Sequence, residues 1–263
     1  MSANRQLKQA AGSLNERLEK ISSALKINSA SDDAAGLAIS EGLSSQIRGG
    51  AQAIKNAQDG ISMIQTAEGG SEQITENLQR IRELSVQAAN DSLSDQDREL
   101  INKEVQQLKE EIDRMTETVE FNGKKLLNGD ISSGEKIQAG ADRGETVEVS
   151  ADAQDTSTLG VSGTDVTSRQ NAEQAIEDTT GAINQVATDR AKLGAQQNRL
   201  ESTIEFVKVQ NENQQAAESR IRDADMARQT TKKASANIKT QAATSALTQA
   251  NNLQGSTALQ LLG

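Results

Sequence analysis

Few side chains in this 263-residue sequence could carry out catalysis. Cys and His are absent, which excludes a thiol nucleophile, a Ser-His-Asp triad, an imidazole base and the usual zinc sites. The adjacent carboxylates of Asp32 and Asp33 are of the type that transfers protons or binds metal, but acidic residues at a helix start favour the helix dipole without any chemistry. The segment 140–144 lacks the Gly-Lys-Ser/Thr of a phosphate loop and predicts a turn. The sequence therefore predicts no enzyme activity, no metal site and no cofactor.

The charge balance argues against two classes of partner. The net charge is −10, and no basic run is longer than two residues, so nucleic-acid binding is not expected. No stretch approaches the roughly 20 apolar residues of a membrane span, and membrane insertion is not expected either. The N-terminus has no apolar signal-peptide core, so an extracellular protein of this sequence would be exported by another route.

Proline is absent from the sequence, and apolar residues recur at seven-residue spacing near both ends. Both features favour long helices, each with a narrow apolar seam that needs a partner helix. We therefore expect the two ends of the chain to pair with each other or with copies of themselves. The N-terminal seam comprises Leu7, Ala11, Leu14, Leu18, Ile21 and Leu25, and a second series comprises Val186, Leu193, Leu200 and Val207.

The pattern predicts helices over 3–27, 33–89, from 94 onwards, 168–222 and from 225 to the end. Ser31 or Asp32 is expected to cap the second helix, and Ser94 with Asp97 to form a capping box at the third. The second and third helices should form a hairpin, with the charges along 98–114 as a solvated face.

Between the helices, alternation at period two predicts a β-hairpin with strands over 137–141 and 146–150. The expected fold class is mainly α: a long antiparallel helical bundle or coiled coil with a small β-hairpin region in the middle.

Four long stretches resemble bacterial flagellin, the subunit of the flagellar filament. They are SALKINSASDDAAGLAI at 23–39, QRIRELSVQAAN at 79–90, FNGKKLL at 121–127 and ESRIRDADMA at 218–227. Flagellins usually open with a segment containing an Ile-Asn-Thr-Asn-like run, and this chain is expected to begin after it. Only about ten residues, from 159 to about 168, stand where flagellins often carry large outer domains, so a minimal form is expected.

The resemblance implies a secreted structural protein that self-assembles into the extracellular filament for motility. Segments 1–32 and 223–263 would pair as an inner tube, 33–130 and 169–222 would form a helical rod, and 131–168 would hold the hairpin and a short loop. The implied polymerisation seam comprises Leu7, Leu14, Leu18, Ile21, Leu25, Ala250, Leu253 and Leu261.

Two further partners are implied by the same resemblance. An export chaperone would cover the C-terminal helix, because exposed apolar seams in a monomer tend to associate. A Toll-like receptor of innate immunity would recognise Gln79, Arg80, Leu84 and Glu104, which would also serve subunit contacts. Arg80 and Leu84 are four apart and are expected to share a helix face as an interface pair.

Two alternatives stay open from the sequence. A hook–filament junction protein of the same superfamily shares the terminal organisation. A chemoreceptor-like signalling domain is also a long helical hairpin, but it would lack any β segment.

Overall fold

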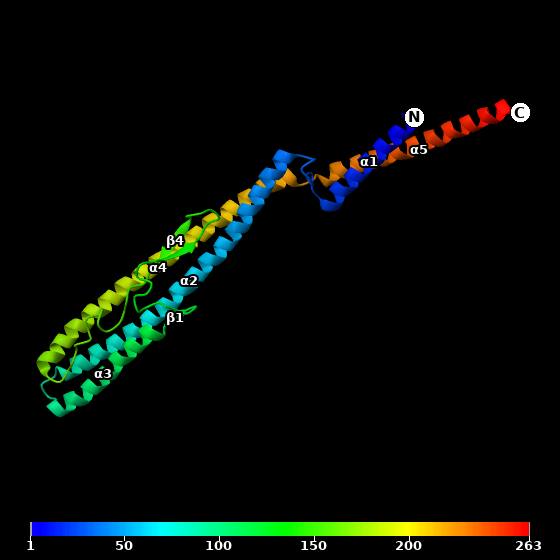
Figure 1. Cartoon of the computed structure of the whole chain (residues 1–263). Coiled ribbons are helices and arrows are strands. Elements are labelled where there is room, and N and C mark those ends of the chain that lie inside the picture. Colours follow the sequence, from blue (N-terminus) through cyan, green and yellow to red (C-terminus); the bar gives the residue numbers. More distant parts are fainter. Residues whose placement is uncertain (1, 263) are drawn as a thin grey trace. The chain divides into compact units, whose positions relative to one another are not determined.

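The computed structural model describes residues 2–262, with side chains described at 4–250 and 252–253. The helices are α1 (Ser2–Ser23), α2 (Ala34–Ala88), α3 (Asp95–Thr118), α4 (Arg169–Arg222) and α5 (Met226–Leu262) (Figure 1). The strands are β1 (Glu120–Phe121), β2 (Lys124–Lys125), β3 (Glu135–Gln138) and β4 (Thr146–Val149). The predicted class, mainly α with a small β-hairpin region in the middle, is confirmed.

The chain divides into two compact units. Unit 1 comprises residues 1–47 and 212–263, and unit 2 comprises residues 48–211. The long helices α2 and α4 contribute residues to both units. These divisions differ from the expected domain limits, and the assignment of segments to an inner tube and a rod stays a prediction.

Unit 2 is held together by an apolar stripe that α2, α3 and α4 share where they lie side by side (Figure 1). Its central side chains are at most 2% exposed, and burying each contributes about 2 kcal/mol. They are Ile74, Leu78 and Ile81 on α2, Val105 and Ile112 on α3, and Val186, Leu193 and Leu200 on α4.

Two glycines inside α2 let neighbouring elements approach its backbone. A Cβ at Gly60 would lie 3.2 Å from Leu200 Cδ1, and one at Gly70 would lie 2.8 Å from Leu127 Cδ1. Glycine in a helix interior costs roughly 1 kcal/mol relative to alanine, and here close packing offsets that cost.

The helix ends agree only partly with expectation. The Ser94–Asp97 capping box is present, whereas α2 is capped by Asp33, whose Oδ1 accepts the Gly36 N–H at 2.9 Å, and not by Ser31 or Asp32. The predicted end of the first helix at 27 is wrong: α1 ends at Ser23, because Ala24 adopts a positive φ of 59°.

The β-hairpin forms, but its first strand is shifted from 137–141 to Glu135–Gln138. Glu135 pairs with Val149, and Gln138 pairs with Thr146, so the chain already turns at 139–145. The presence of this hairpin makes the chemoreceptor alternative, an unbroken helical hairpin, wrong.

The solvated face expected along 98–114 is interrupted by two buried cations, Arg98 and Lys109. Arg98 donates from Nε to Ala88 O at 2.9 Å, from Nη2 to Asn90 O at 2.9 Å and from Nη1 to Leu93 O at 3.0 Å. The C-terminal carbonyls of a helix lack intrahelical partners and carry partial negative charge. Arg98 therefore closes the α2–α3 turn, which periodicity alone does not reveal.

Further along α3, Lys109 binds the main chain of segment 155–166, which consists mainly of turns. Its Nζ donates to Ser162 O at 2.6 Å and Thr164 O at 3.0 Å, and burial lowers the pKa of its ammonium. One turn later, Asp113 accepts the Thr156 N–H at 2.8 Å. Side chains of α3 thus satisfy the backbone of a segment that has no strand partner of its own.

We expect Arg98→Met to lower the free energy of unfolding by about 2–4 kcal/mol, because it leaves buried carbonyls without donors. Urea unfolding followed by circular dichroism measures the change. The matched control is Arg114→Met, whose exposed guanidinium pairs with Glu111 on the same helix and should matter by less than about 1 kcal/mol. Equal effects of the two substitutions would contradict the role of Arg98.

Candidate subunit interface and recognition surface

The α1–α5 pair carries most of the predicted seam. Leu7, Leu14, Ile21 and Leu25 are half-buried, whereas Leu18 stays 40% exposed. On α5, Ala250 and Leu253 are exposed, and Leu261 lies outside the residues whose side chains are described. The pairing therefore covers the α1 seam in part, and the described C-terminal seam residues are not buried by it.

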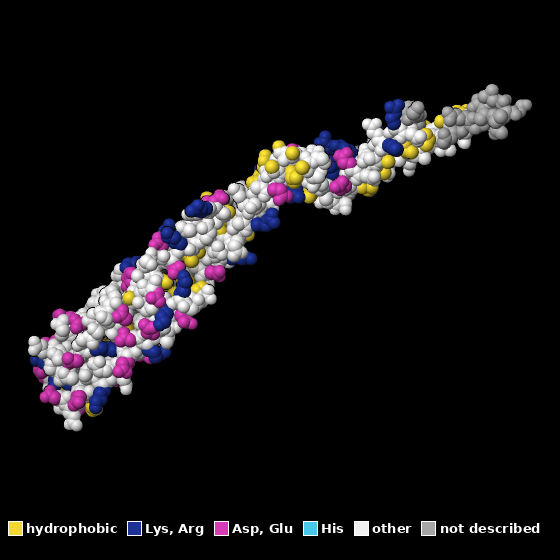
Figure 2. Space-filling model, viewed as in Figure 1, with side chains coloured by type: hydrophobic (Ala, Val, Ile, Leu, Met, Phe, Trp, Pro, Cys, Tyr) yellow, Lys and Arg dark blue, Asp and Glu magenta, His cyan; other side chains and the backbone are white. Residues whose placement is uncertain are grey.

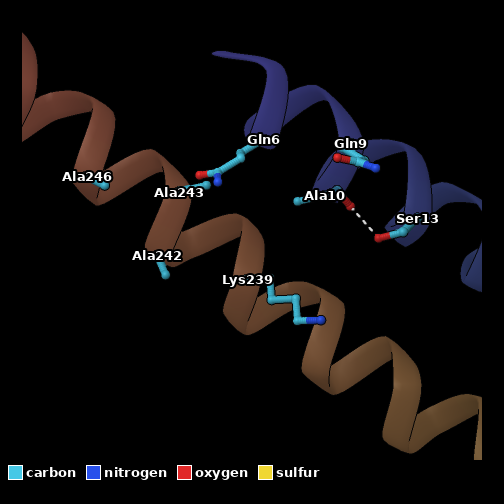
Figure 3. A pocket seen from close by; sticks show the side chains of 8 residues that line it. All are labelled: Gln6, Gln9, Ala10, Ser13, Lys239, Ala242, Ala243 and Ala246. Carbon is cyan, nitrogen blue, oxygen red and sulfur yellow. Dashed lines mark hydrogen bonds between the residues drawn. The ribbon is translucent and has the colours of Figure 1, made fainter. Parts of the chain in front are cut away.

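A groove of 620 Å³ runs between α1 and α5. In Figure 3, Gln6 extends from α1 towards α5, and the α5 side is formed mainly by alanines. Small side chains permit a further helix to approach closely, and the amides of α1 offer hydrogen bonds. The lining residues are Gln6, Gln9, Ala10, Ser13, Lys239, Ala242, Ala243 and Ala246.

Large apolar side chains are exposed on unit 1, and Figure 2 shows hydrophobic side chains on the surface along α5. Ile238 is 67% exposed, Ile39 55% and Met226 42%. None of the three belongs to the predicted seam, although their apolar type within helical segments was a usable signal. Exposed apolar surface of this kind marks protein–protein contact sites.

In unit 1, the segment that connects α1 to α2 is hydrogen-bonded to the segment that connects α4 to α5. Lys26 N–H donates to Arg222 O at 2.6 Å, and Ala224 N–H donates to Ala24 O at 2.9 Å. Asp32 binds Lys20 Nζ at 2.8 Å and accepts the Asn28 N–H. The hydrogen bond from Lys20, followed by that from Asn28, lowers the pKa of Asp32 to about 2.

The predicted recognition residues are brought together only in part. Arg80 donates from Nη2 to Glu104 Oε1 at 2.9 Å across α2 and α3, and from Nη1 to Glu83 at 3.1 Å. The Glu104 hydrogen bonds are the largest cause of a raised Arg80 pKa. Gln79 is exposed nearby and lines a 430 Å³ groove with Arg82, Glu83, Thr180 and Ile183. Arg80, Glu104 and Gln79 thus form one accessible polar surface.

Leu84 does not belong to that surface. It is 2% exposed and packs in the core of unit 2, so the expectation that it stands beside Arg80 as an exposed anchor is wrong. Side chains four residues apart on a helix point in similar but not identical directions. Leu84 therefore lies inside the apolar stripe of α2, whereas Arg80 lies just outside it.

No catalytic or metal constellation emerges in the described part of the chain. Within it, no group of three or more His, Cys, Asp or Glu could hold a metal ion. Asp33 caps α2, Asp32 pairs with Lys20, and the segment 140–144 forms the turn of the β3–β4 hairpin. No described helix combines the length and the hydropathy that a membrane span needs.

The N-terminal and C-terminal parts of the chain each match a known protein family. Residues 1–131 match the bacterial flagellin N-terminal helical region, and residues 175–262 match the bacterial flagellin C-terminal helical region. Flagellin of Halalkalibacterium halodurans is 45% identical, covering 93% of this chain and 90% of that protein. Flagellin of Bacillus subtilis is 43% identical, covering 94% and 92% respectively.

Solved structures give the same fold. The crystal structure of Bacillus cereus flagellin is 31% identical, with a TM-score of 0.53 over 62% of this chain and 94% of that chain. A putative flagellar hook-associated protein from Vibrio parahaemolyticus has a TM-score of 0.62 over 73% of this chain and 99% of that chain. Its identity is 17%, so that likeness concerns the fold alone.

Because the folded pKa of Asp32 lies below its ordinary value of 3.8, its contacts stabilise unit 1 above about pH 3.8 and are lost as the pH falls through about 2. Side-chain carboxyl NMR should place the Asp32 midpoint near pH 2 in the parent chain. Lys20→Met should move that midpoint towards 3.8, whereas Lys8→Met on the same helix should leave it unchanged. A parent midpoint near 3.8 would contradict the ion pair.

Proposed function

The chain belongs to the bacterial flagellin family, and from this premise we propose that its α1–α5 pair, with the exposed apolar face of α5, forms the contacts through which copies assemble. A flagellin is a structural, non-enzymatic protein, and the extracellular flagellar filament that it builds is a homopolymer serving motility. The proposal concerns which residues of this chain perform the assembly.

The observation that carries the proposal is the exposed apolar surface of unit 1. Ile238 is 67% exposed on α5, beside a helix pair whose groove is lined by alanines and amides. Burying such a side chain stabilises an interface by about 1.5–3 kcal/mol. A neighbouring copy that places its own terminal helix on this face removes that surface from water.

Assembly by this route is open-ended. The α5 face of one copy meets a different surface of the next copy, and a heterologous contact that does not close into a ring produces a helical filament. The seam residues Leu7, Leu14, Leu18, Ile21, Leu25, Ala250, Leu253 and Leu261 are proposed to line this contact.

The same face is a suitable docking site for an export chaperone. The apolar side chains that the filament buries are exposed in the single chain, where they favour premature association. A chaperone that covers α5 before export would prevent this, and it would leave when the next copy takes its place.

We expect Ile238→Ser to abolish filaments or shorten them greatly in negative-stain microscopy, and to weaken chaperone binding in pull-down from the source cell. Asn237→Ser, which changes the exposed polar residue just before Ile238 and lies outside the groove lining, is the matched control and should affect filament assembly and chaperone binding less. Circular dichroism should show unchanged helix content for both variants. Normal filaments from Ile238→Ser would contradict the proposed interface.

We also propose that Gln79, Arg80 and Glu104 bind a Toll-like receptor. The support is their exposure and the Arg80–Glu104 ion pair, which holds the guanidinium in a fixed orientation. An oriented arginine at the centre of a polar patch is a frequent hot spot of protein interfaces. Leu84 is left out of this proposal because its side chain is buried.

Arg80→Ala combined with Glu104→Ala should reduce receptor activation by at least about tenfold, as expected for losing a hot-spot residue. A reporter-cell assay with purified monomer measures the change. The control pair is Glu111→Ala with Arg114→Ala, a second exposed ion pair on unit 2. Equal loss in both pairs would indicate a general charge effect and not a binding site.

A further inference from the structure

We propose that Asn122 is a site of spontaneous modification, at which the side-chain amide is lost to water and isoaspartate forms in the main chain. The inference goes beyond the proposed function and does not depend on assembly. It concerns one turn of a single chain, and the only co-reactant is solvent water.

The site is the two-residue turn that joins β1 to β2. Phe121 pairs with Lys124 across this hairpin, so Asn122 and Gly123 form the turn itself. Both turn residues have a positive φ, 51° at Asn122 and 77° at Gly123. Hairpin turns of this kind favour Asn followed by Gly, because these two residues adopt the left-handed region most readily. The fold therefore places an Asn–Gly pair at an exposed position.

An Asn–Gly pair carries both partners of a cyclisation. The main-chain nitrogen of Gly123 attacks Cγ of Asn122, so that an N–Cγ bond forms and the Cγ–Nδ2 bond breaks. The amide leaves as ammonia and takes the proton of the Gly123 N–H. One water molecule then opens the five-membered imide at either of its carbonyls, which gives aspartate or isoaspartate. Glycine at the second position favours the attack, because it has no Cβ to hinder the nitrogen.

The surroundings of this pair leave it open to the reaction. Both residues are exposed, and a Cβ added to Gly123 would meet no atom within 4 Å. Among the described residues, the Asn122 side chain has no hydrogen-bond partner that would hold its amide. The strands β1 and β2 have two residues each, so the hairpin opens locally at low cost. Local opening lets the Gly123 nitrogen reach Cγ.

The second Asn–Gly pair of the sequence, Asn128–Gly129, has the same chemistry in a more restrained setting. Oδ1 of Asn128 accepts the Asp130 N–H at 3.0 Å, which holds the side chain in place. The two residues before this pair, Leu126 and Leu127, are completely buried. Opening the chain here exposes both leucines to water, so this pair should react more slowly than Asn122–Gly123.

The modification changes the hairpin in which it forms. Isoaspartate adds a carbon atom to the main chain and a negative charge to the turn, so Phe121 and Lys124 no longer face each other across a two-residue turn. Phe121 is half-buried and packs against the core of unit 2. Chains that have aged should therefore differ from new chains at the β1–β2 turn.

The first test is ageing of the purified, folded chain at mildly alkaline pH in water enriched in oxygen-18, followed by peptide mapping with mass spectrometry. Position 122 should gain the label at least about tenfold faster than position 128, because only the second reaction exposes two buried leucines. In urea the two rates should converge. Equal rates in the folded chain overturn the proposal, and so does an Asn122 that reacts only in urea.

The second test detects isoaspartate directly, with a carboxyl methyltransferase specific for that residue and labelled S-adenosylmethionine. The aged parent chain should accept methyl groups, and Asn122→Gln should remove most of this signal, because glutamine forms a cyclic imide much more slowly. Asn128→Gln is the matched control and should leave the signal nearly unchanged. Equal methylation of the parent chain and Asn122→Gln overturns the assignment.

Discussion

The apolar stripe of α2 is the contact on which the rest of unit 2 depends. It faces α4 and α3 at once, and its central residues Ile74, Leu78 and Ile81 are completely buried. The chain has few aromatic residues, so the helices must approach closely to leave no voids. Gly60 and Gly70 permit that approach where Leu200 and Leu127 pack against α2. A slender bundle built from aliphatic side chains follows from this constraint.

Charged residues of α3 form hydrogen bonds with main-chain groups that the apolar stripe does not pair. Segment 155–166, which consists mainly of turns, buries Leu159, Val161 and Val166 against the bundle, but many of its main-chain groups have no helix or strand partner. Lys109 and Asp113 bind its backbone directly, and Arg98 binds the carbonyls that end α2. Charged side chains therefore act here as hydrogen-bond partners of the main chain, where removing one would leave buried groups unsatisfied.

Unit 1, in contrast to unit 2, leaves several large apolar side chains exposed. The α1–α5 pair buries little, and it leaves Ile238, Ile39 and Met226 exposed to solvent. Such surface is a disadvantage for a single soluble chain but an advantage for a subunit of a homopolymer, because each contact is formed only after copies meet. The core of unit 2 forms within one chain, whereas under the proposed assembly unit 1 would bury its exposed apolar side chains only when copies meet.

The sequence by itself determined the helices, the capping box at Ser94 and the family, because heptad spacing, the absence of proline and long motifs are local signals. It also located the β-hairpin, although it placed the start of the first strand two residues too late. Only the tertiary structure decided that Leu84 is buried beside an exposed Arg80, and that Arg98 and Lys109 are internal. Burial depends on which neighbours cover a helix face, and no residue's own type or spacing specifies those neighbours. The exposure of Ile238 was decided in the same way.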